Sequence, residues 1–305
     1  MTFLPHASRP SSRPRRSVLT VPAINERALF KVQSLDCDAV IFDLEDSVAP
    51  ERKAEARLLL SQFLRSADLG QRERIIRING ADGTHFRDDM AMVIAAAPDA
   101  VLLPKVEDPD AVLDAVQLLE ERDSAEAVRI WAMIETPLGV LNAAAIAATG
   151  RTEAGRLDAL VVGLNDLRKA TGIPAEPERR YLVPYLMQIV LAARAFGLDV
   201  IDSVSNTYSD LITFDTECAQ GAAMGFDGKM LIHPAQIASA NRAFGPSDDT
   251  IAEARLLIEA FSDPANAGLN VMTINGRMVE RLHAEEAARL LERVAFLKDR
   301  KDPTA

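Results

Sequence analysis

The sequence predicts an α/β protein, a (β/α)₈ TIM barrel with a C-terminal helical extension. Short runs rich in Val, Ile and Leu alternate with helical segments from about residue 17 to residue 245. The runs lack strict apolar–polar alternation, which is typical of parallel strands covered on both faces. Eight strand–helix units can be counted, the number that closes such a barrel. A doubly wound open sheet is the competitor, but no Gly-x-Gly-x-x-Gly segment follows the first run.

Eight strands are expected in chain order. They are SVLTVPA (17–23), DAVIFDLED (38–46), RIIRIN (74–79), AVLLPKV (100–106), VRIWAMIE (128–135), ALVVGLND (159–166), VIDSVS (200–205) and KMLIHP (229–234). Between them lie periodic segments such as 50–64 and 183–197, the second closing with Gly197 at an expected C-cap. After the second strand, Ser47 is the expected cap of the next helix and Pro50 lies in its first turn.

Two segments flank the expected barrel domain of residues 16–245. Residues 1–15 form an arm rich in Pro, Ser and Arg, which we expect to be flexible. Residues 246–305 have too little apolar surface to fold alone, so we expect them to pack on the barrel or on a neighbouring subunit. The pattern there predicts a helix at 248–261, a turn-rich break at 262–270, an extended piece at 271–280 and a helix at 283–297.

Composition narrows the classes of partner and compartment. The net charge of −11 argues against nucleic acid or an anionic membrane as the main partner. No apolar run approaches the roughly 20 residues of a membrane helix, and the first residues lack the apolar core of a secretory signal. Cys37 and Cys218 lie in no CxxC or Cys/His cluster, so neither a disulfide framework nor a zinc site is expected. The cytoplasm is the expected compartment.

Polar side chains gather at the carboxyl ends of the expected strands, where barrels of this kind carry out chemistry. They are Asp43, Glu45, Asp46, Arg77, Asn79, Lys105, Glu135, Asn165, Asp166 and His233. Glu135 and Asp166 follow neighbouring strands, which lie about 4.8 Å apart, so they can converge on one point. Two convergent carboxylates with no Cys and no paired His suit Mg²⁺ or Mn²⁺. Glu45 and Asp46 are then outer groups that orient bound waters.

Each of these residues also has a purely structural alternative. Asp43 can be a strand-end residue bonded to neighbouring backbone, Lys105 can pair with Glu107, and His233 can be a structural histidine. Arg77 alternates with Ile and should point into the barrel, where an unpaired charge is costly. It therefore needs either a structural carboxylate or an anionic ligand.

Longer stretches carry a family resemblance. They are RSVLTVP, FDLEDSVAPERKAEAR, IRING, LLPKVE, MIETPLGVLNAAAIA, VVGLNDL and GFDGKMLIHPAQIASANRAF, with GRMVERLHAEEAARLL extending into the tail. In these stretches the chain resembles the HpcH/HpaI aldolase superfamily, specifically the branch of citrate lyase β subunits, malyl-CoA lyases and citramalyl-CoA lyases. The resemblance covers about residues 16 to 245 and part of the tail.

The resemblance implies an activity and its residues. It implies a lyase that cleaves or forms a carbon–carbon bond in a 3-hydroxyacyl-CoA thioester, such as malyl-, citramalyl- or citryl-CoA, with a 2-oxo acid and an acyl-CoA as the other partners. It implies that Glu135 and Asp166 bind Mg²⁺, that Arg77 grips substrate oxygens, and that the tail acid Glu280 protonates the enolate carbon. It also implies a homotrimer or dimer of trimers in which the C-terminal segment crosses onto an adjacent subunit.

Further residues are expected to bind substrate, and some depart from the family pattern. Lys31 matches a CoA-contacting lysine, and the expected substrate-binding residues at the strand ends include Pro104, Lys105, Ile232 and His233. Glu280 stands where the family usually has Asp, Ala23 replaces the Gly of a VPG pattern, and Asn165 stands where many relatives carry Ala or Glu.

Three other functions compete with a lyase that acts alone. The same site could present water to the thioester carbonyl, which would make the chain an acyl-CoA thioesterase. It could also be a citrate lyase β subunit that works in a complex on an acyl-carrier protein, although a tail that closes over free CoA would obstruct such a carrier. A barrel that kept its fold and lost its site is disfavoured, because Glu135, Asp166 and Arg77 are all present.

Overall fold

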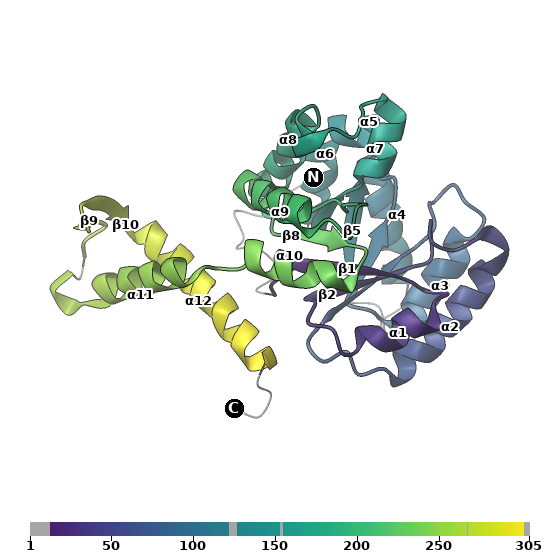
Figure 1. The fold of residues 1–305 in the computed structure, drawn as a ribbon, viewed down its shortest axis with the longest axis horizontal. Coiled ribbons are helices and arrows are strands. Elements are labelled where there is room, and N and C mark those ends of the chain that lie inside the picture. Colours follow the sequence, from purple (N-terminus) through teal and green to yellow (C-terminus); the bar gives the residue numbers. More distant parts are fainter. Residues whose placement is uncertain (1–12, 122–126, 153–154, 267, 302–305) are drawn as a thin grey trace. The chain divides into compact units, whose positions relative to one another are not determined.

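A computed structural model describes residues 13–121, 127–152, 155–266 and 268–301. Most of the expected N-terminal arm, residues 1–12, lies outside the described residues. Two compact units make up the chain, one containing Arg15–Phe244 and the other Gly245–Ala305. The first unit is a closed barrel of eight parallel strands with helices around it (Figure 1). The predicted TIM-barrel fold is confirmed.

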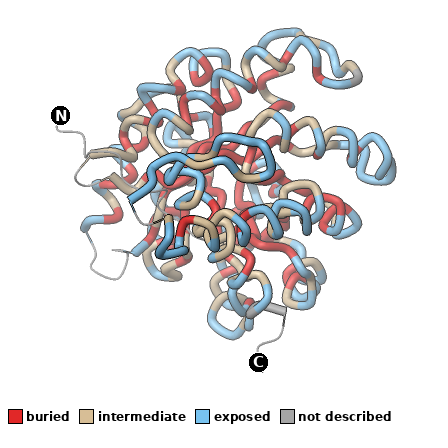
Figure 2. The backbone as a smooth tube through the Cα atoms, turned by 90° about the vertical axis from the view of Figure 1, so that its left-hand side faces the viewer, coloured by how far each residue is buried: buried red, intermediate tan, exposed pale blue. Residues whose placement is uncertain are grey.

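The eight strands pair in chain order, and the last returns to the first. They are β1 (Ser17–Pro22), β2 (Ala39–Asp43), β3 (Glu73–Arg77), β4 (Ala100–Leu103), β5 (Arg129–Ile134), β6 (Leu157–Val162), β7 (Asp199–Asp202) and β8 (Gly228–Leu231). β8 closes the barrel on β1, with Met230 opposite Val18. Inward-facing apolar side chains such as Ile41, Ile75 and Trp131 fill the barrel. A second, larger apolar layer lies between the strands and the helices. Because both faces of each strand are covered, the strands are mostly buried (Figure 2), which explains the unbroken apolar runs.

Helices follow the strands around the barrel. They are α1 (Glu26–Val32), η1 (Pro50–Arg52), α2 (Lys53–Ser66), α3 (Phe86–Ala96), α4 (Pro109–Glu120), α5 (Pro137–Leu141), α6 (Ala143–Ala148), η3 (Thr149–Arg151), α7 (Leu164–Thr171), η4 (Pro177–Arg179), α8 (Val183–Ala195), α9 (Leu211–Met224), η5 (Pro234–Gln236) and α10 (Ile237–Ala243). Gly197 follows α8 with a φ of 69°, as expected for a helix C-terminus. No helix of the described ranges is both long and apolar enough to cross a membrane.

The predicted cap at Ser47 is wrong. The 3₁₀ turn η1 begins at Pro50, its N-cap position is Ala49, and no side chain caps it. Ser47 instead donates its backbone N–H to the Asp43 carboxylate at 3.1 Å. The Asp43 carboxylate therefore holds the turn before η1, and η1 itself begins without a side-chain cap. The placement of Pro50 at the helix start is confirmed.

A buried ion cluster lies at the amino ends of the strands, just before β1. Arg15, only 3% exposed, donates to both oxygens of Glu73 at 2.7 and 2.8 Å. The same guanidinium reaches Asp158 at 2.5 Å and Asp199 at 3.0 Å, and it lies 4.8 Å from the centre of the Trp131 ring. Arg15 thus ties the segment before β1 to strands β3, β5, β6 and β7.

The second unit is a helical hairpin with a small sheet. Its elements are α11 (Asp248–Ser262), η6 (Pro264–Asn266), β9 (Val271–Ile274), β10 (Arg277–Glu280) and α12 (Arg281–Lys301). α11 packs against α12. The expected extended piece at 271–280 is two antiparallel strands, joined at Asn275 and Gly276 with φ of 50° and 76°. An Asn-Gly pair favours this hairpin turn because both residues tolerate positive φ.

Candidate active site

The site begins where β2 leaves the barrel, at Asp43. This fully buried carboxylate accepts the backbone N–H groups of Glu45 at 2.9 Å and Ser47 at 3.1 Å. It also accepts two hydrogen bonds from Arg77, from Nε and Nη2, each 2.7 Å long. Burial alone would raise the pKa of Asp43, but the hydrogen bonds and charge of Arg77 outweigh it and lower the pKa. The structural alternative for Asp43 therefore holds, with a partner in addition to the backbone.

Arg77 is held in a fixed orientation by Asp43. Asp43 and Arg77 lie opposite each other in the β2–β3 register, which brings the guanidinium fork onto the carboxylate. The remaining terminal nitrogen, Nη1, lies 3.1 Å from Glu45 Oε2 and 3.8 Å from Asp46. The sequence left two possible partners for Arg77, a structural carboxylate or an anionic ligand, and the structural carboxylate is present. One edge of the guanidinium still faces the rim of the barrel.

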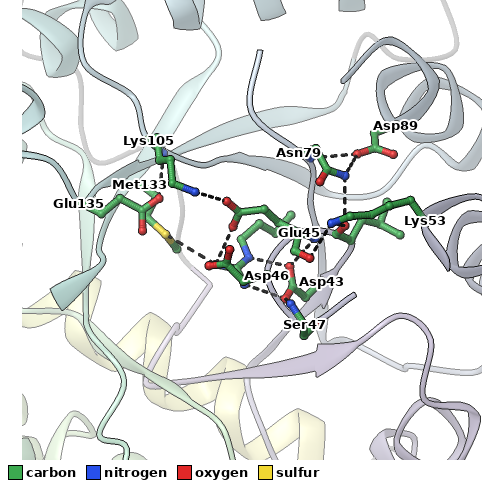
Figure 3. Close-up of polar contacts among 12 residues, drawn as sticks. Asp43, Glu45, Asp46, Ser47, Lys53, Asn79, Asp89, Lys105, Met133 and Glu135 are labelled. Atoms are coloured by element: carbon green, nitrogen blue, oxygen red, sulfur yellow. Dashed lines mark hydrogen bonds and ion pairs between the residues drawn. The ribbon is translucent and has the colours of Figure 1, made fainter. Parts of the chain in front are cut away.

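Glu45 lies between two cations and keeps one oxygen without a hydrogen bond. Lys105 Nζ donates to its Oε1 at 2.6 Å (Figure 3). Its Oε2 is buried and accepts no hydrogen bond from the described residues, although Arg77 is within ion-pair distance. Burial raises the pKa of Glu45, and the charges of Arg77 and Lys105 only partly oppose this. Asp46 next to it is more than half exposed.

Lys105 joins three strand ends. It follows Pro104 at the end of β4, with a positive φ of 50°, and its backbone N–H donates to Glu135 Oε1 at 2.9 Å. Its ammonium pairs with Glu45 rather than with Glu107, so the expected alternative pair is wrong. The Lys105 side chain therefore links the ends of β4 and β2 instead of pairing with a near neighbour in sequence.

Glu135 and Asp166 form a pair of carboxylates after β5 and β6. Glu135 is 2% exposed, while Asp166 is half-buried in the first turn of α7. The pKa of Glu135 is raised to about 8, mainly by burial and then by the charges of Glu45 and Asp166, while the Lys105 N–H and Arg77 oppose the shift. Glu135 is therefore a buried acid whose charged form the local cations do not fully stabilise.

These donors fit a hard divalent cation. Mg²⁺ typically takes one or two protein carboxylates and keeps water or substrate oxygens at its other positions. In the described ranges no group of three or more His, Cys, Asp and Glu side chains could hold a metal, which argues against an all-protein cage. A buried oxygen without a hydrogen bond on Glu45 and a buried acid with a raised pKa are what a bound cation and its waters would compensate.

The remaining predicted site residues belong to other elements of the chain. His233 accepts the Ala235 N–H on Nδ1, forms a capping box with Gln236, and stacks on Tyr208 with ring centres 4.6 Å apart. These contacts give it a structural role, and a substrate contact by His233 or by the neighbouring, 40% exposed Ile232 stays a prediction. Lys31 is exposed in the last turn of α1. Glu280 ends β10 in the second unit, and its side chain is exposed.

Sequence reasoning missed Lys53. This lysine is 6% exposed at the start of α2 and donates to the carbonyl oxygens of Leu44 at 2.8 Å and Glu45 at 2.7 Å (Figure 3). It shares the buried face of α2 with Ala56 and Leu60. A charged residue on the apolar stripe of a helix was the signal that could have identified it. Lys53 holds the backbone from which Glu45 projects.

An eight-stranded parallel barrel with ionisable side chains at the carboxyl ends of its strands defines the class of (β/α)₈-barrel enzymes. Residues 16–234 match the HpcH/HpaI aldolase/citrate lyase family. The chain belongs to this family, and the resemblance found in the sequence is confirmed.

Characterised relatives and a solved structure resemble this chain over most of its length. The chain is 44% identical to a (3S)-malyl-CoA thioesterase of Cereibacter sphaeroides over 92% of this chain and 94% of that protein. It is 32% identical to the mitochondrial citramalyl-CoA lyase of Homo sapiens over 94% of this chain and 87% of that protein. The solved structure of CitE from Mycobacterium tuberculosis in complex with magnesium, acetoacetate and coenzyme A has a TM-score of 0.71 and 27% identity, and covers 93% of this chain and 100% of that one.

Proposed function

We propose that this chain is a Mg²⁺-dependent carbon–carbon lyase. Its reaction cleaves, or in reverse forms, a 3-hydroxyacyl-CoA thioester such as malyl-, citramalyl- or citryl-CoA, and the other partners are a 2-oxo acid and an acyl-CoA. The observation that carries the proposal is the pair Glu135 and Asp166 beside Arg77 in a barrel of this family. The citramalyl-CoA lyase relative and the magnesium and coenzyme A complex of CitE support the same reaction class and cofactor.

Glu135 and Asp166 are the proposed metal ligands, with Mn²⁺ as an alternative ion. When bound, the cation would supply Lewis-acid polarisation of the substrate's oxygens. In the cleavage direction the 3-hydroxyl loses its proton, the bond between C2 and C3 breaks, and its electron pair passes to the thioester fragment as an enolate. Asp43 holds the Arg77 guanidinium in place, so that Arg77 Nη1 would donate to the substrate oxygen on which negative charge develops.

Glu45 and Asp46 are proposed to act at the edge of the metal site. Glu45 Oε2, which accepts no hydrogen bond from the described residues, would accept one from a bound water or from the substrate hydroxyl. Lys105 holds the other oxygen of Glu45 and keeps the carboxylate oriented. Asp46 is more exposed and would orient waters farther out.

The remaining proposed roles concern the CoA thioester and the second unit. Lys31, Pro104, Lys105, Ile232 and His233 are proposed substrate contacts, and Glu280 is the proposed acid that protonates the enolate carbon. We further propose a homotrimer or dimer of trimers in the cytoplasm, with Glu280 acting on a neighbouring subunit. Mixing Glu280→Gln with Arg77→Lys subunits should restore some activity, and no recovery would argue for a site within one chain.

A thioesterase is the second candidate, and the 44% identity to a (3S)-malyl-CoA thioesterase favours it. In that reaction water adds to the thioester carbonyl, the carbon–sulfur bond breaks, and free CoA leaves with the proton. The same metal site and the same Glu45 could orient that water. The two reactions therefore break different bonds of the substrate but would use the same residues of the site.

One paired assay separates the candidates. Malyl-CoA and citramalyl-CoA are supplied with Mg²⁺ and, in parallel, with EDTA, and 2-oxo acid and free thiol are followed separately. Oxo acid without free thiol is the expected result and would establish the lyase. Free thiol without oxo acid would establish the thioesterase instead. Activity that survives EDTA and the Glu135→Ala variant would overturn the metal assignment for both.

A further inference from the structure

Helix α7, which carries Asp166 in its first turn, begins without a side-chain cap of its own. Its N-cap residue is Gly163. The first N–H groups of a helix have no partner within the helix and need one from elsewhere. Four other α-helices of the barrel unit solve this with their own N-cap side chains, α1 with Asn25, α4 with Asp108, α5 with Thr136 and α9 with Asp210. α7 needs another solution.

Glu135 is the reason why position 163 has no side chain. A Cβ atom at Gly163 would lie 2.4 Å from Glu135 Oε2 and 2.5 Å from Glu135 Cβ, closer than such atoms can approach. The φ of Gly163 is −110°, which other residues adopt readily, so space and not backbone conformation requires the glycine. The room that Glu135 occupies excludes the Ser, Asp or Asn that would cap α7 from its own N-cap position.

Ser203, at the end of β7, supplies the missing cap from a neighbouring strand. Its Oγ accepts the backbone N–H of Leu164, the first residue of α7, at 3.0 Å. Ser203 is 1% exposed, so water cannot easily replace this hydrogen bond. Leu164 is equally buried, which holds the start of the helix against the core.

Ser203 is itself held by a buried network. Its backbone N–H donates to Asp202 Oδ1 at 2.8 Å. Asp202 in turn accepts from Lys229 at 2.9 Å and from Arg179 at 2.7 and 2.9 Å, and all three side chains are almost completely buried. The hydroxyl therefore projects from a segment that is fixed by buried hydrogen bonds and ion pairs.

A second contact from the same segment reaches α7 next to Asp166. Asn206 and Asn165 exchange side-chain hydrogen bonds of 2.8 and 3.2 Å. Both residues are exposed, so this pair competes with water and is the weaker of the two contacts. Ser203 and Asn206, which both follow β7, therefore hold Leu164 and Asn165, the two residues before Asp166, in place.

We propose that Ser203 is a positioning residue for the metal site. It caps α7 across the barrel wall and thereby sets where the Asp166 carboxylate lies relative to Glu135. This inference rests on the proposed function, in which Asp166 and Glu135 bind Mg²⁺. Residues that orient metal ligands typically affect metal affinity about 10- to 100-fold when changed.

The test measures Mg²⁺ binding to the full chain by calorimetry, together with kcat and the Mg²⁺ concentration for half-maximal activity. Ser203→Ala should weaken Mg²⁺ binding about tenfold or more and raise the half-maximal Mg²⁺ concentration, while kcat at saturating Mg²⁺ changes less. Hydrogen exchange should show the Leu164 amide losing protection. Ser203→Thr, which keeps the hydroxyl, should recover most of the Mg²⁺ affinity and most of the protection of the Leu164 amide. If Ser203→Ala does not fold, Ser203→Cys takes its place, since sulfur keeps the volume but accepts weakly.

Ser17→Ala is the matched control. Ser17 is also fully buried, and its Oγ accepts the backbone N–H of Asp38 at 3.1 Å, at the amino end of β1. Its loss should lower stability without changing Mg²⁺ affinity. Weakened binding in Asp166→Ala with normal binding in Ser203→Ala would overturn this inference alone. Normal binding in Asp166→Ala would overturn the metal assignment itself and the inference with it.

Discussion

The two ends of the barrel contain the same kinds of residue in opposite arrangements. At the amino ends of the strands Arg15 lies at the centre of three carboxylates, Glu73, Asp158 and Asp199, and contacts each of them, while Arg129 lies 3.6 Å from Asp158 at the edge. At the carboxyl ends the centre is negative, because Glu135 experiences the charges of both Glu45 and Asp166. The cations there lie at the edge, with Arg77 bound to Asp43 and Lys105 to Glu45.

The difference separates a structural ion cluster from a binding site. Where the chain supplies the central cation, each hydrogen bond ties one strand to another and the cluster is complete. Where it leaves carboxylates around a centre without a cation of its own, burial and mutual repulsion raise the pKa of Glu135 to about 8. This difference supports the proposal that the carboxyl end binds a cation from solution.

The largest expected effect is at the carboxyl end and concerns activity. Glu135→Gln keeps the shape of the side chain but removes the charge, so Mg²⁺-dependent turnover should fall at least about 10³-fold, which corresponds to roughly 4 kcal/mol. The fold should remain, as circular dichroism would show, because the acid contributes to a site and not to the packing of the strands. Turnover within a few-fold of wild type would place the metal elsewhere.

At the amino end the corresponding change should affect stability. Arg15→Met leaves Glu73, Asp158 and Asp199 buried without their common cation, which typically costs about 3–5 kcal/mol. Urea unfolding should show this loss, whereas kcat of the folded fraction should stay close to wild type. A loss of kcat without loss of stability would contradict the division of roles between the two ends.

An exposed ion pair provides the control for that comparison. Arg52 and Glu55 pair at 2.8 Å with both side chains half exposed. Arg52→Ala should leave the free energy of unfolding nearly unchanged, because solvent already screens this pair. A loss as large as that of Arg15→Met would show that removal of any arginine destabilises the protein.

Arg77→Lys should have the next largest effect. Lysine keeps the charge but cannot bind Asp43 through two nitrogens and still present a third to the rim. We expect kcat to fall about 10²-fold, roughly 2.7 kcal/mol, with a smaller change in Mg²⁺ affinity. Steady-state kinetics together with calorimetry would measure both. An equal loss in affinity and in kcat would indicate that the whole site had collapsed.

Much of the fold and the grouping of the charged residues at the carboxyl ends of the strands could be predicted from the sequence. Strands buried on both faces leave unbroken apolar runs, and eight of them with helices between predict a barrel. A barrel brings the carboxyl ends of its strands together, so Glu135, Asp166 and Arg77 could be grouped before their contacts were known. These predictions depend on properties that each residue has in its local sequence.

The contacts between strands could not be predicted in the same way. Asp43 binds Arg77 because of the β2–β3 register, and long connections between parallel strands leave no local trace of register. Ser203 caps a helix about forty residues away in sequence, which no local pattern indicates. The Asn275–Gly276 hairpin is different, since its turn signal was present in the sequence but the segment was interpreted as one extended piece.

A smaller effect than that of Arg77→Lys sharpens the comparison through pH. In the metal-free protein Glu135 has a pKa of about 8, above the ordinary value of 4.5, and a cation must displace that proton to bind. Mg²⁺ affinity should therefore rise with pH, by up to about tenfold per unit below pH 8 (about 1.4 kcal/mol per unit), and level off above it. Calorimetry in buffers of different ionisation enthalpy would detect the released proton. Affinity that is constant from pH 6 to 9, with no proton released, would mean that Glu135 is already ionised in the metal-free protein. The negative charge at the carboxyl end would then be compensated by cations of the chain itself, as it is at the amino end.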